Sequence, residues 1–341
     1  MAGLITYQDT DIVNDTQKVV TSTWSNNTNI SSTAHTASLQ ANFSNSTSSG
    51  AFYIDVYNED ISSTSAAVQY SIAYGHSKGS GSLNFTNDVG AKGNSATKCI
   101  YNQYRQLVYG DEGSNFKFND YTPDDIYVIN VNRARFKHNL KPGTLDLQLS
   151  GSGLGILHLT DDSITKTGSA VITNAGRQFN IVSGSTGVML GSALTQTAGS
   201  GSYGLFYPDS GFAILNARAI KQRLTDVSPA ITDHATPTGT QKLFNAISGA
   251  GYFVLDSEEK VSSQYYFTRI KNNEFNYTTN PSFIDSTGNV NFTSMINNPK
   301  TYITTVGLYN NMGDLVAVAK LSQPISKDFT KEALIRVKLD Y

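Results

Sequence analysis

The sequence predicts a mainly β protein with a few short helices, an α+β chain whose strands form antiparallel sheets or sandwiches. Three observations predict this class. Short segments that alternate apolar and polar residues recur along the chain, residues typical of turns separate them, and few segments carry the 3.6-residue spacing of a helix. With 341 residues, 39% of them hydrophobic, the chain is long enough for two or three domains and apolar enough to bury a core.

Residues 301–341 carry the clearest strand pattern. Residues 302–308 and 315–321 are rich in β-branched and aromatic side chains, and the turn between them contains residues that tolerate a positive φ angle: Asn310, Asn311, Gly313 and Asp314. This pattern predicts a hairpin, followed by a connection that contains a proline. In the last segment, apolar residues alternate with polar ones, which predicts a half-buried terminal strand with one face made of Ile335, Val337, Leu339 and Tyr341.

The first half of the chain starts with a polar segment, residues 1–50, whose apolar groups are too small to form a core alone. Residues 21–50 fit either a solvated loop or β-structure with polar outward faces, because Ser, Thr and Asn suit both. Alternation predicts a strand pair at 51–58 and 66–74. Residues 97–109 change to helical spacing, with Gly110 as the stop signal and one apolar face made of Ile100, Tyr104, Leu107 and Val108.

The middle of the chain continues with short strands, predicted at 126–132, 145–149, 156–159, 171–181, 188–194, 252–255 and 264–271. Asp161 and Asp162 are expected in a solvent-exposed turn. Residues 211–220 predict a buried strand that leads into a turn of helix, and 241–247 a short helix. Because residues 224–239 have a linker-like composition, we predict a polar arm at 1–50 and two β-rich domains at 51–225 and 226–341.

Composition argues against several classes of function. Only 15% of the residues are charged and the net charge is −2, so the chain lacks the basic character that attracts nucleic acid or an anionic membrane. Cys99 is the only cysteine, which excludes an internal disulfide and a thiolate-rich metal site. The first residues lack the pattern of a secretory leader, and no window is apolar enough for a membrane span. We therefore expect a soluble protein that binds neither nucleic acid nor membrane.

Several motifs resemble chemical sites but are better explained by structure. A G-x-G-x-x-G pattern at Gly199, Gly201 and Gly204 is followed by turn residues, whereas a phosphate site needs a helix there. The basic segment 133–141 fits a solvated strand edge or a partner contact better than a phosphate site.

Candidate metal and catalytic side chains are also poorly arranged. No two histidines have metal-site spacing; they are His35, His76, His138, His158 and His234. Three aspartates near the N-terminus lack the rest of a calcium loop and fit an acidic first turn of a helix; they are Asp9, Asp11 and Asp15. The pairs Asp124–Asp125 and Asp161–Asp162 fit solvated turns better than a glycosidase site. We expect no catalytic residue, no metal and no cofactor.

Core packing explains most of the tyrosines, and the excess of aromatic residues indicates contacts with other molecules. The chain has 19 Tyr and 16 Phe against one Trp, and many Tyr stand beside Asn or Ser. Such side chains combine a large contact area with adaptable hydrogen bonds, a composition suited to protein or sugar contacts.

The C-terminal part, from about residue 252, resembles virion structural proteins of large contractile-tailed bacteriophages, especially T4-like phages of cyanobacteria. The resemblance lies in the segments RIKNNEFNYTTNP at 269–281, NP at 298–299, YITTVGL at 302–308 and AVAKLSQP at 317–324. Weaker similarity extends to the N-terminal half, at LITYQDTDIVNDTQ, AFYIDVYNED, CIYNQYRQLV and IYVINVNRARFKHNLKPG. The resemblance implies a tail or baseplate-associated component and no enzymatic activity.

The resulting hypothesis is a non-enzymatic structural subunit of a contractile phage tail, in the baseplate region of a myovirus virion and assembled in the host cytoplasm. We expect its partners to be other tail or baseplate proteins and further copies of itself in a symmetric oligomer. Two alternatives stay open: a receptor-binding or glycan-degrading tail fibre or spike, and a neck or capsid-associated protein. The candidate contacts are an N-terminal arm, the loop at 270–283, and the side chains Trp24, Phe275, Asn276, Tyr277, Phe283 and Tyr341.

Overall fold

The computed structural model describes residues 4–25, 30, 35–36, 53–79, 97–119, 121–151, 155–165, 170–189, 202–223, 238–277 and 280–341. Its contacts divide the chain into two compact units. The C-terminal unit comprises Met1–Lys18 and Lys260–Tyr341, and the large unit comprises Val19–Glu259. The predicted class is confirmed, because antiparallel strands dominate both units and the helices are few and short. The predicted domains at 1–50, 51–225 and 226–341 stay a prediction.

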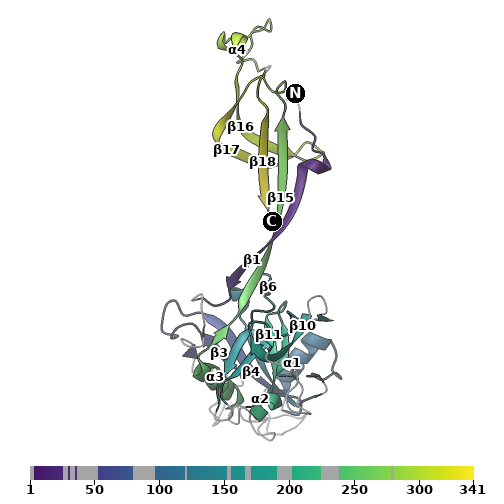
Figure 1. Cartoon of the computed structure of the whole chain (residues 1–341), viewed down its shortest axis with the longest axis vertical. Coiled ribbons are helices and arrows are strands. Elements are labelled where there is room, and N and C mark those ends of the chain that lie inside the picture. Colours follow the sequence, from purple (N-terminus) through teal and green to yellow (C-terminus); the bar gives the residue numbers. More distant parts are fainter. Residues whose placement is uncertain are drawn as a thin grey trace. The chain divides into compact units, whose positions relative to one another are not determined.

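The large unit is built on a single curled antiparallel sheet with the strand order β14-β7-β8-β10-β12-β13-β5-β4-β3-β2. Figure 1 labels β3, β4 and β10 among these strands. Two further short strands, β9 and β11, pair with β10. The bounds are β2 His35–Thr36, β3 Tyr53–Tyr57, β4 Val68–His76, β5 Asp125–Val131, β6 Asn139–Leu140, β7 Asp146–Leu149, β8 Leu157–Asp161, β9 Val171–Thr173, β10 Gly176–Ser185, β11 Val188–Met189, β12 Gly204–Tyr207, β13 Phe212–Asn216 and β14 Phe253–Val254. The helical segments are α1 Thr97–Tyr109, α2 Ala217–Arg223, α3 Thr238–Ala250 and the 3₁₀ turn η4 Arg133–Arg135.

Most strand and helix predictions in this unit are confirmed where the structure describes the residues. The pair at 51–58 and 66–74 forms β3 and β4, and segment 211–220 forms β13 followed by α2. The helix predicted at 241–247 is the longer α3. Most of segment 21–50 and all of 190–194 and 224–237 lie outside the described residues.

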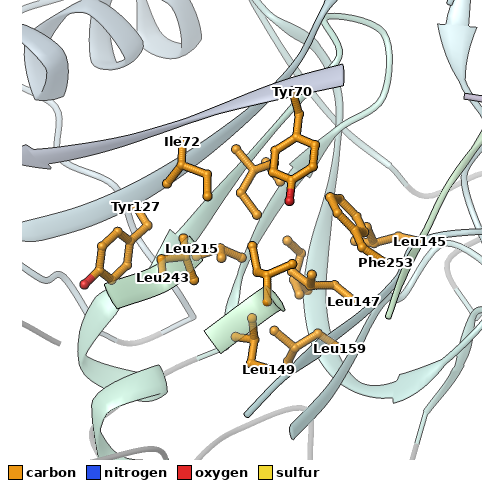
Figure 2. Packing of buried hydrophobic residues seen from close by; sticks show 14 of the residues in the cluster. Tyr70, Ile72, Tyr127, Leu145, Leu147, Leu149, Leu159, Leu215, Leu243 and Phe253 are labelled. Carbon is orange, nitrogen blue, oxygen red and sulfur yellow. The ribbon is translucent and has the colours of Figure 1, made fainter. Parts of the chain in front are cut away.

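Both faces of the middle of this sheet are buried. Residues of β5 alternate between two hydrophobic clusters, with Tyr127 and Ile129 in one and Ile126 and Val128 in the other. Figure 2 shows side chains of the first cluster, among them Tyr70, Leu147 and Phe253, which point toward one another. Strands buried on both faces read as continuous apolar runs, which explains why β13 has no alternating pattern in the sequence.

The helix predicted at 97–109 is confirmed, but the predicted inward face is wrong by part of a turn. Tyr101 and Val108 are buried, whereas Leu107 is 44% exposed. The reason lies in β4, where Gly75 has no side chain and α1 packs directly on its backbone. A Cβ atom at Gly75 would lie 2.9 Å from the backbone nitrogen of Tyr101. This close approach turns the Tyr101 side of the helix toward the sheet.

We expect Gly75→Ala to lower the free energy of unfolding of the large unit by about 1–3 kcal/mol, because the added methyl group overpacks the contact with α1. Denaturant unfolding followed by circular dichroism measures the change. Gly113→Ala is the matched control, since a Cβ atom there meets only a side-chain oxygen of Asp111 at 3.8 Å. Equal stabilities of the two variants would contradict the close packing of α1 on β4.

The prediction that Asp161 and Asp162 are solvated turn residues is wrong. Both are fully buried, and their carboxylates accept backbone N–H groups from neighbouring segments. Asp161 accepts the N–H of Gly143 at 2.9 Å, and Asp162 accepts the N–H of Asn180 at 2.8 Å. Burial raises the pKa of Asp161, and hydrogen bonds from Ser163 and from the N–H of Gly143 oppose that shift. The two carboxylates therefore fasten loops to the sheet.

The C-terminal unit packs a two-stranded hairpin onto a sheet with the order β1-β15-β18. Its elements are the 3₁₀ turn η1 Asp9–Asp11, β1 Ile12–Ser22, β15 Asp256–Ile270, α4 Ser294–Asn297, β16 Thr301–Tyr309, β17 Leu315–Lys327 and β18 Ala333–Asp340. Strands β1 and β15 begin in one unit and end in the other. Buried side chains from both layers form one core: Ile270, Val306, Leu308, Ala333, Ile335 and Val337.

The predicted hairpin and terminal strand are confirmed, with two corrections. Pro324 lies inside β17 and not in a connection. It stands at the point where the pairing register with β16 shifts, between Ile303 and Thr305. Such an irregularity accommodates a proline, which cannot donate to the ladder. Tyr341 was placed on the buried face of the last strand but is 71% exposed.

The acidic N-terminal segment is partly as predicted. Asp9 and Asp11 form a 3₁₀ turn, in which the Asp11 carboxylate accepts the N–H of Gln8 at 3.0 Å. Asp15 was expected in the same acidic turn, but it lies in β1.

Candidate functional site

The loop after β15, residues 271–277, has a defined conformation held by its own polar groups. The Glu274 carboxylate accepts the N–H of Lys271 at 2.9 Å, and the Asn276 amide donates to the carbonyl of Asn272 at 2.6 Å. Phe275 has a φ angle of 53°, a left-handed backbone conformation that residues other than glycine rarely adopt. Such a conformation persists where surrounding contacts impose it.

Lys327, the last residue of β17, supplies those contacts. Its side chain is 1% exposed, and its ammonium group donates to the carbonyl of Asn272 at 3.1 Å, to the carbonyl of Glu274, and to Oδ1 of Asn276 at 2.7 Å. Thr301, which pairs with Lys327 across the hairpin, donates from its hydroxyl to the carbonyl of Phe275 at 3.1 Å. The base of the hairpin therefore holds three backbone carbonyl groups of the loop, those of Asn272, Glu274 and Phe275.

Burial disfavours the charged form of the Lys327 ammonium group, but its hydrogen bonds stabilise the loop. Burial lowers the pKa of Lys327, and the nearby carboxylates of Glu274 and Asp328 oppose that shift. A lysine ammonium has three donors, and here each has an acceptor. Hydrogen bonds to a charged group contribute about 1.5–3 kcal/mol each in favourable cases, so the loop is fixed and not merely covered.

The fixed loop leads into a row of aromatic rings, two of them exposed and one half-buried. We define the aromatic row as Tyr277, Phe283 and Phe292. The rings of Tyr277 and Phe283 meet edge to face with centroids 6.2 Å apart, and those of Phe283 and Phe292 lie 5.8 Å apart. Tyr277 is 55% exposed and Phe292 is 51% exposed. An exposed group of large aromatic side chains is typical of a contact surface.

A compact turn at residues 285–289 connects Phe283 and Phe292 and is held by hydrogen bonds to one carboxylate. The Asp285 carboxylate accepts the hydroxyl of Thr287 at 2.7 Å and the backbone N–H groups of Thr287 and Asn289, each at 2.8 Å. These hydrogen bonds, the Thr287 hydroxyl first, lower the pKa of Asp285 to about 2. The carboxylate therefore stays ionised down to about pH 3, where an unperturbed aspartate is mostly protonated.

The six predicted contact residues lie in different environments. Phe275 is 41% exposed beside the row, while Tyr277 and the half-buried Phe283 belong to it. Asn276 is buried and holds the loop. Tyr341 is exposed, and its backbone pairs with Ser262.

Trp24 lies in the core of the large unit, where it is 3% exposed and donates from Nε1 to the carbonyl of Phe253 at 2.8 Å. Little of its side chain is therefore open to a partner.

The residues of this site that the sequence interpretation missed include Lys327 and Phe292. A lysine at the end of a strand ordinarily indicates a solvated end, and nothing in the pattern indicates the distant carbonyl groups that it binds. Phe292 stands in a polar segment, where a single aromatic residue carries no periodic signal.

The other candidate sites have local structural roles where the structure describes them. Gly204 begins strand β12, so no helix follows the glycine pattern, and Gly199 and Gly201 lie outside the described residues. In the basic segment, Arg133 donates to the carbonyls of Phe136 and Lys137, and Lys137 pairs with Glu259 at 2.8 Å.

Among the residues that the structure describes, no three His, Cys, Asp or Glu side chains come close enough to hold a metal ion. No helix within the described ranges is long and apolar enough to cross a membrane.

Comparisons with known proteins find no match: no family model, no curated protein and no solved structure is significantly similar to this chain.

Proposed function

We propose that this chain is a non-enzymatic structural subunit of a contractile phage tail, in the baseplate region, that holds neighbouring subunits through exposed β-surfaces and loops. The observation that carries the proposal is the aromatic row and the loop that Lys327 holds beside it. The loop lies within the part of the chain that most resembles virion structural proteins, from about residue 252 to residue 341. The resemblance supports the place in the virion, and the surface supports the mode of action.

A fixed aromatic surface suits a permanent structural contact. Association costs less free energy when the contacting side chains are already ordered, because less conformational entropy is lost on binding. Phe275 and Tyr277 stand on backbone that Lys327 and Thr301 hold in place. In a symmetric assembly each copy repeats the same contact, so that many modest contacts add to a stable structure.

We expect Phe275→Ala/Tyr277→Ala/Phe283→Ala to weaken the contact without unfolding the chain, since Phe275 and Tyr277 are exposed and Phe283 is only half-buried. In particles of the encoding phage, the variant should be incorporated at least tenfold less than the unaltered chain, as measured by quantitative mass spectrometry of purified virions. Phe329→Ala is the control, because Phe329 is as exposed as Tyr277, at 55%, but lies outside the loop and the row.

Cryo-electron microscopy of intact virions tests the assigned place directly. Density for this chain at the baseplate, with the aromatic row against a neighbouring subunit, is the expected result. Its absence from the particle would contradict the proposal. Density at the neck or capsid would support the alternative of a neck or capsid-associated protein. A bound oligosaccharide or release of reducing sugar would favour the fibre or spike alternative.

A further inference from the structure

Strand β18 has one edge without a ladder partner among the described residues. It pairs with β15 alone, in a register that places Tyr265 opposite Lys338. Ser262 and Tyr341 exchange both backbone hydrogen bonds, at 3.1 and 3.0 Å. Because hydrogen-bonded and non-hydrogen-bonded pairs alternate along an antiparallel ladder, every second residue of β18 turns its backbone N–H and C=O away from β15. These residues are Leu334, Arg336, Lys338 and Asp340.

The side chains of the same four residues are exposed, and positive charge occupies the centre of the edge. Arg336 and Lys338 both lie over the ring of Tyr265, at 5.4 and 5.9 Å from its centroid. Lys338 also pairs with Asp340 at 2.9 Å. Attraction to the Tyr265 ring holds both cations on this face of the sheet.

These charges oppose pairing between the same edge of two copies. In the antiparallel register that uses all four residues, Arg336 of each strand faces Lys338 of the other, and Leu334 faces Asp340. Like charges directly opposite each other destabilise a strand pair. Charged residues commonly protect an open edge against self-association in this way. A strand with carboxylates at those two positions would meet complementary charge instead.

We propose that the open edge of β18 binds an extended segment of a partner protein that carries acidic residues two positions apart, opposite Arg336 and Lys338. The segment adds one strand to the sheet, with backbone hydrogen bonds for affinity and the two carboxylates for selectivity. The inference rests on the proposed function, because it assigns a second contact surface to the same structural subunit.

The test uses the purified full chain and a fluorescein-labelled peptide in which two aspartates stand two positions apart among valines. We expect fluorescence anisotropy to show saturable binding that weakens as salt concentration rises. Arg336→Glu/Lys338→Glu should weaken binding at least tenfold and should gain binding of the corresponding lysine peptide. Lys320→Glu, a change of an exposed lysine on β17, is the matched control and should leave both affinities unchanged.

A second peptide separates strand addition from simple charge attraction. N-methylation at alternate residues removes the donors that a ladder needs and keeps both carboxylates, so it should abolish binding. The unmodified peptide should slow hydrogen exchange in residues 333–341. Equal binding of acidic, basic and N-methylated peptides, or no binding at all, would overturn the inference. Sedimentation showing that the chain dimerises through this edge would replace the partner with a second copy and also overturn it.

These outcomes do not depend on where the chain lies in a virion, so the edge and the assigned place can fail separately.

Discussion

Replacing Lys327 with methionine should release the loop at 271–277 and lower the free energy of unfolding of the C-terminal unit by about 3 kcal/mol. Methionine preserves an unbranched side chain of similar length but removes all three donors, so two carbonyl groups and the Asn276 oxygen lose their partner. The loop carbonyls lie near solvent and regain some hydration, which keeps the loss below the sum of three charged hydrogen bonds.

Denaturant unfolding of the C-terminal unit measures the loss of stability, and hydrogen exchange of residues 271–277 reports the release of the loop. Lys320→Met is the matched control, since Lys320 is an exposed lysine on the same strand. Unchanged exchange in Lys327→Met would show that the loop holds its conformation without the ammonium group.

Replacing Trp24 with alanine should destabilise the large unit by about 3–5 kcal/mol, the range expected for removing a buried aromatic side chain. Trp24 packs against Phe253 and Tyr70, with ring centroids 4.9 and 5.6 Å away, and its indole N–H is bonded to a backbone carbonyl. Circular dichroism follows the transition, because the variant has no tryptophan fluorescence.

Trp24→Phe is the conservative control and should lose less, since the ring is retained and only the indole hydrogen bond and part of the volume are removed. If Trp24→Ala left stability unchanged but weakened assembly, the residue would act as the interface contact that the sequence analysis predicted.

Local patterns in the sequence were sufficient for the elements whose cause is local. The turn residues around Gly313 and the alternation from Ile335 onward predicted the hairpin and the last strand, and helical spacing with a glycine stop predicted α1. Each of these signals arises from backbone preference and from burial of one face.

Features that depend on residues distant in the sequence were not predicted. The orientation of α1 follows from Gly75 on another strand, so the helix sequence alone placed Leu107 inward when it is exposed. Asp161 and Asp162 are residue types common in turns. Only the fold buries them and brings backbone N–H donors to their carboxylates.

The candidate site divides in the same way. Phe275 and Tyr277 were predicted from local composition, and their exposure agrees with a contact role. Asn276 was grouped with them, yet it is buried because its amide binds Asn272 and Lys327. Lys327 is 51 residues from Asn276 in the sequence, so its part in the site could be found only from the fold.

The ammonium group of Lys327 uses all three of its donors in the folded loop, so its chemical reactivity reports whether the loop is closed. Acylating reagents attack a free, deprotonated amine, and this amine is buried with every proton engaged. Exposed lysines on the same unit, such as Lys320, will be labelled first. Late modification of Lys327 therefore marks molecules whose loop has opened, and mass spectrometry of a labelled sample can count them.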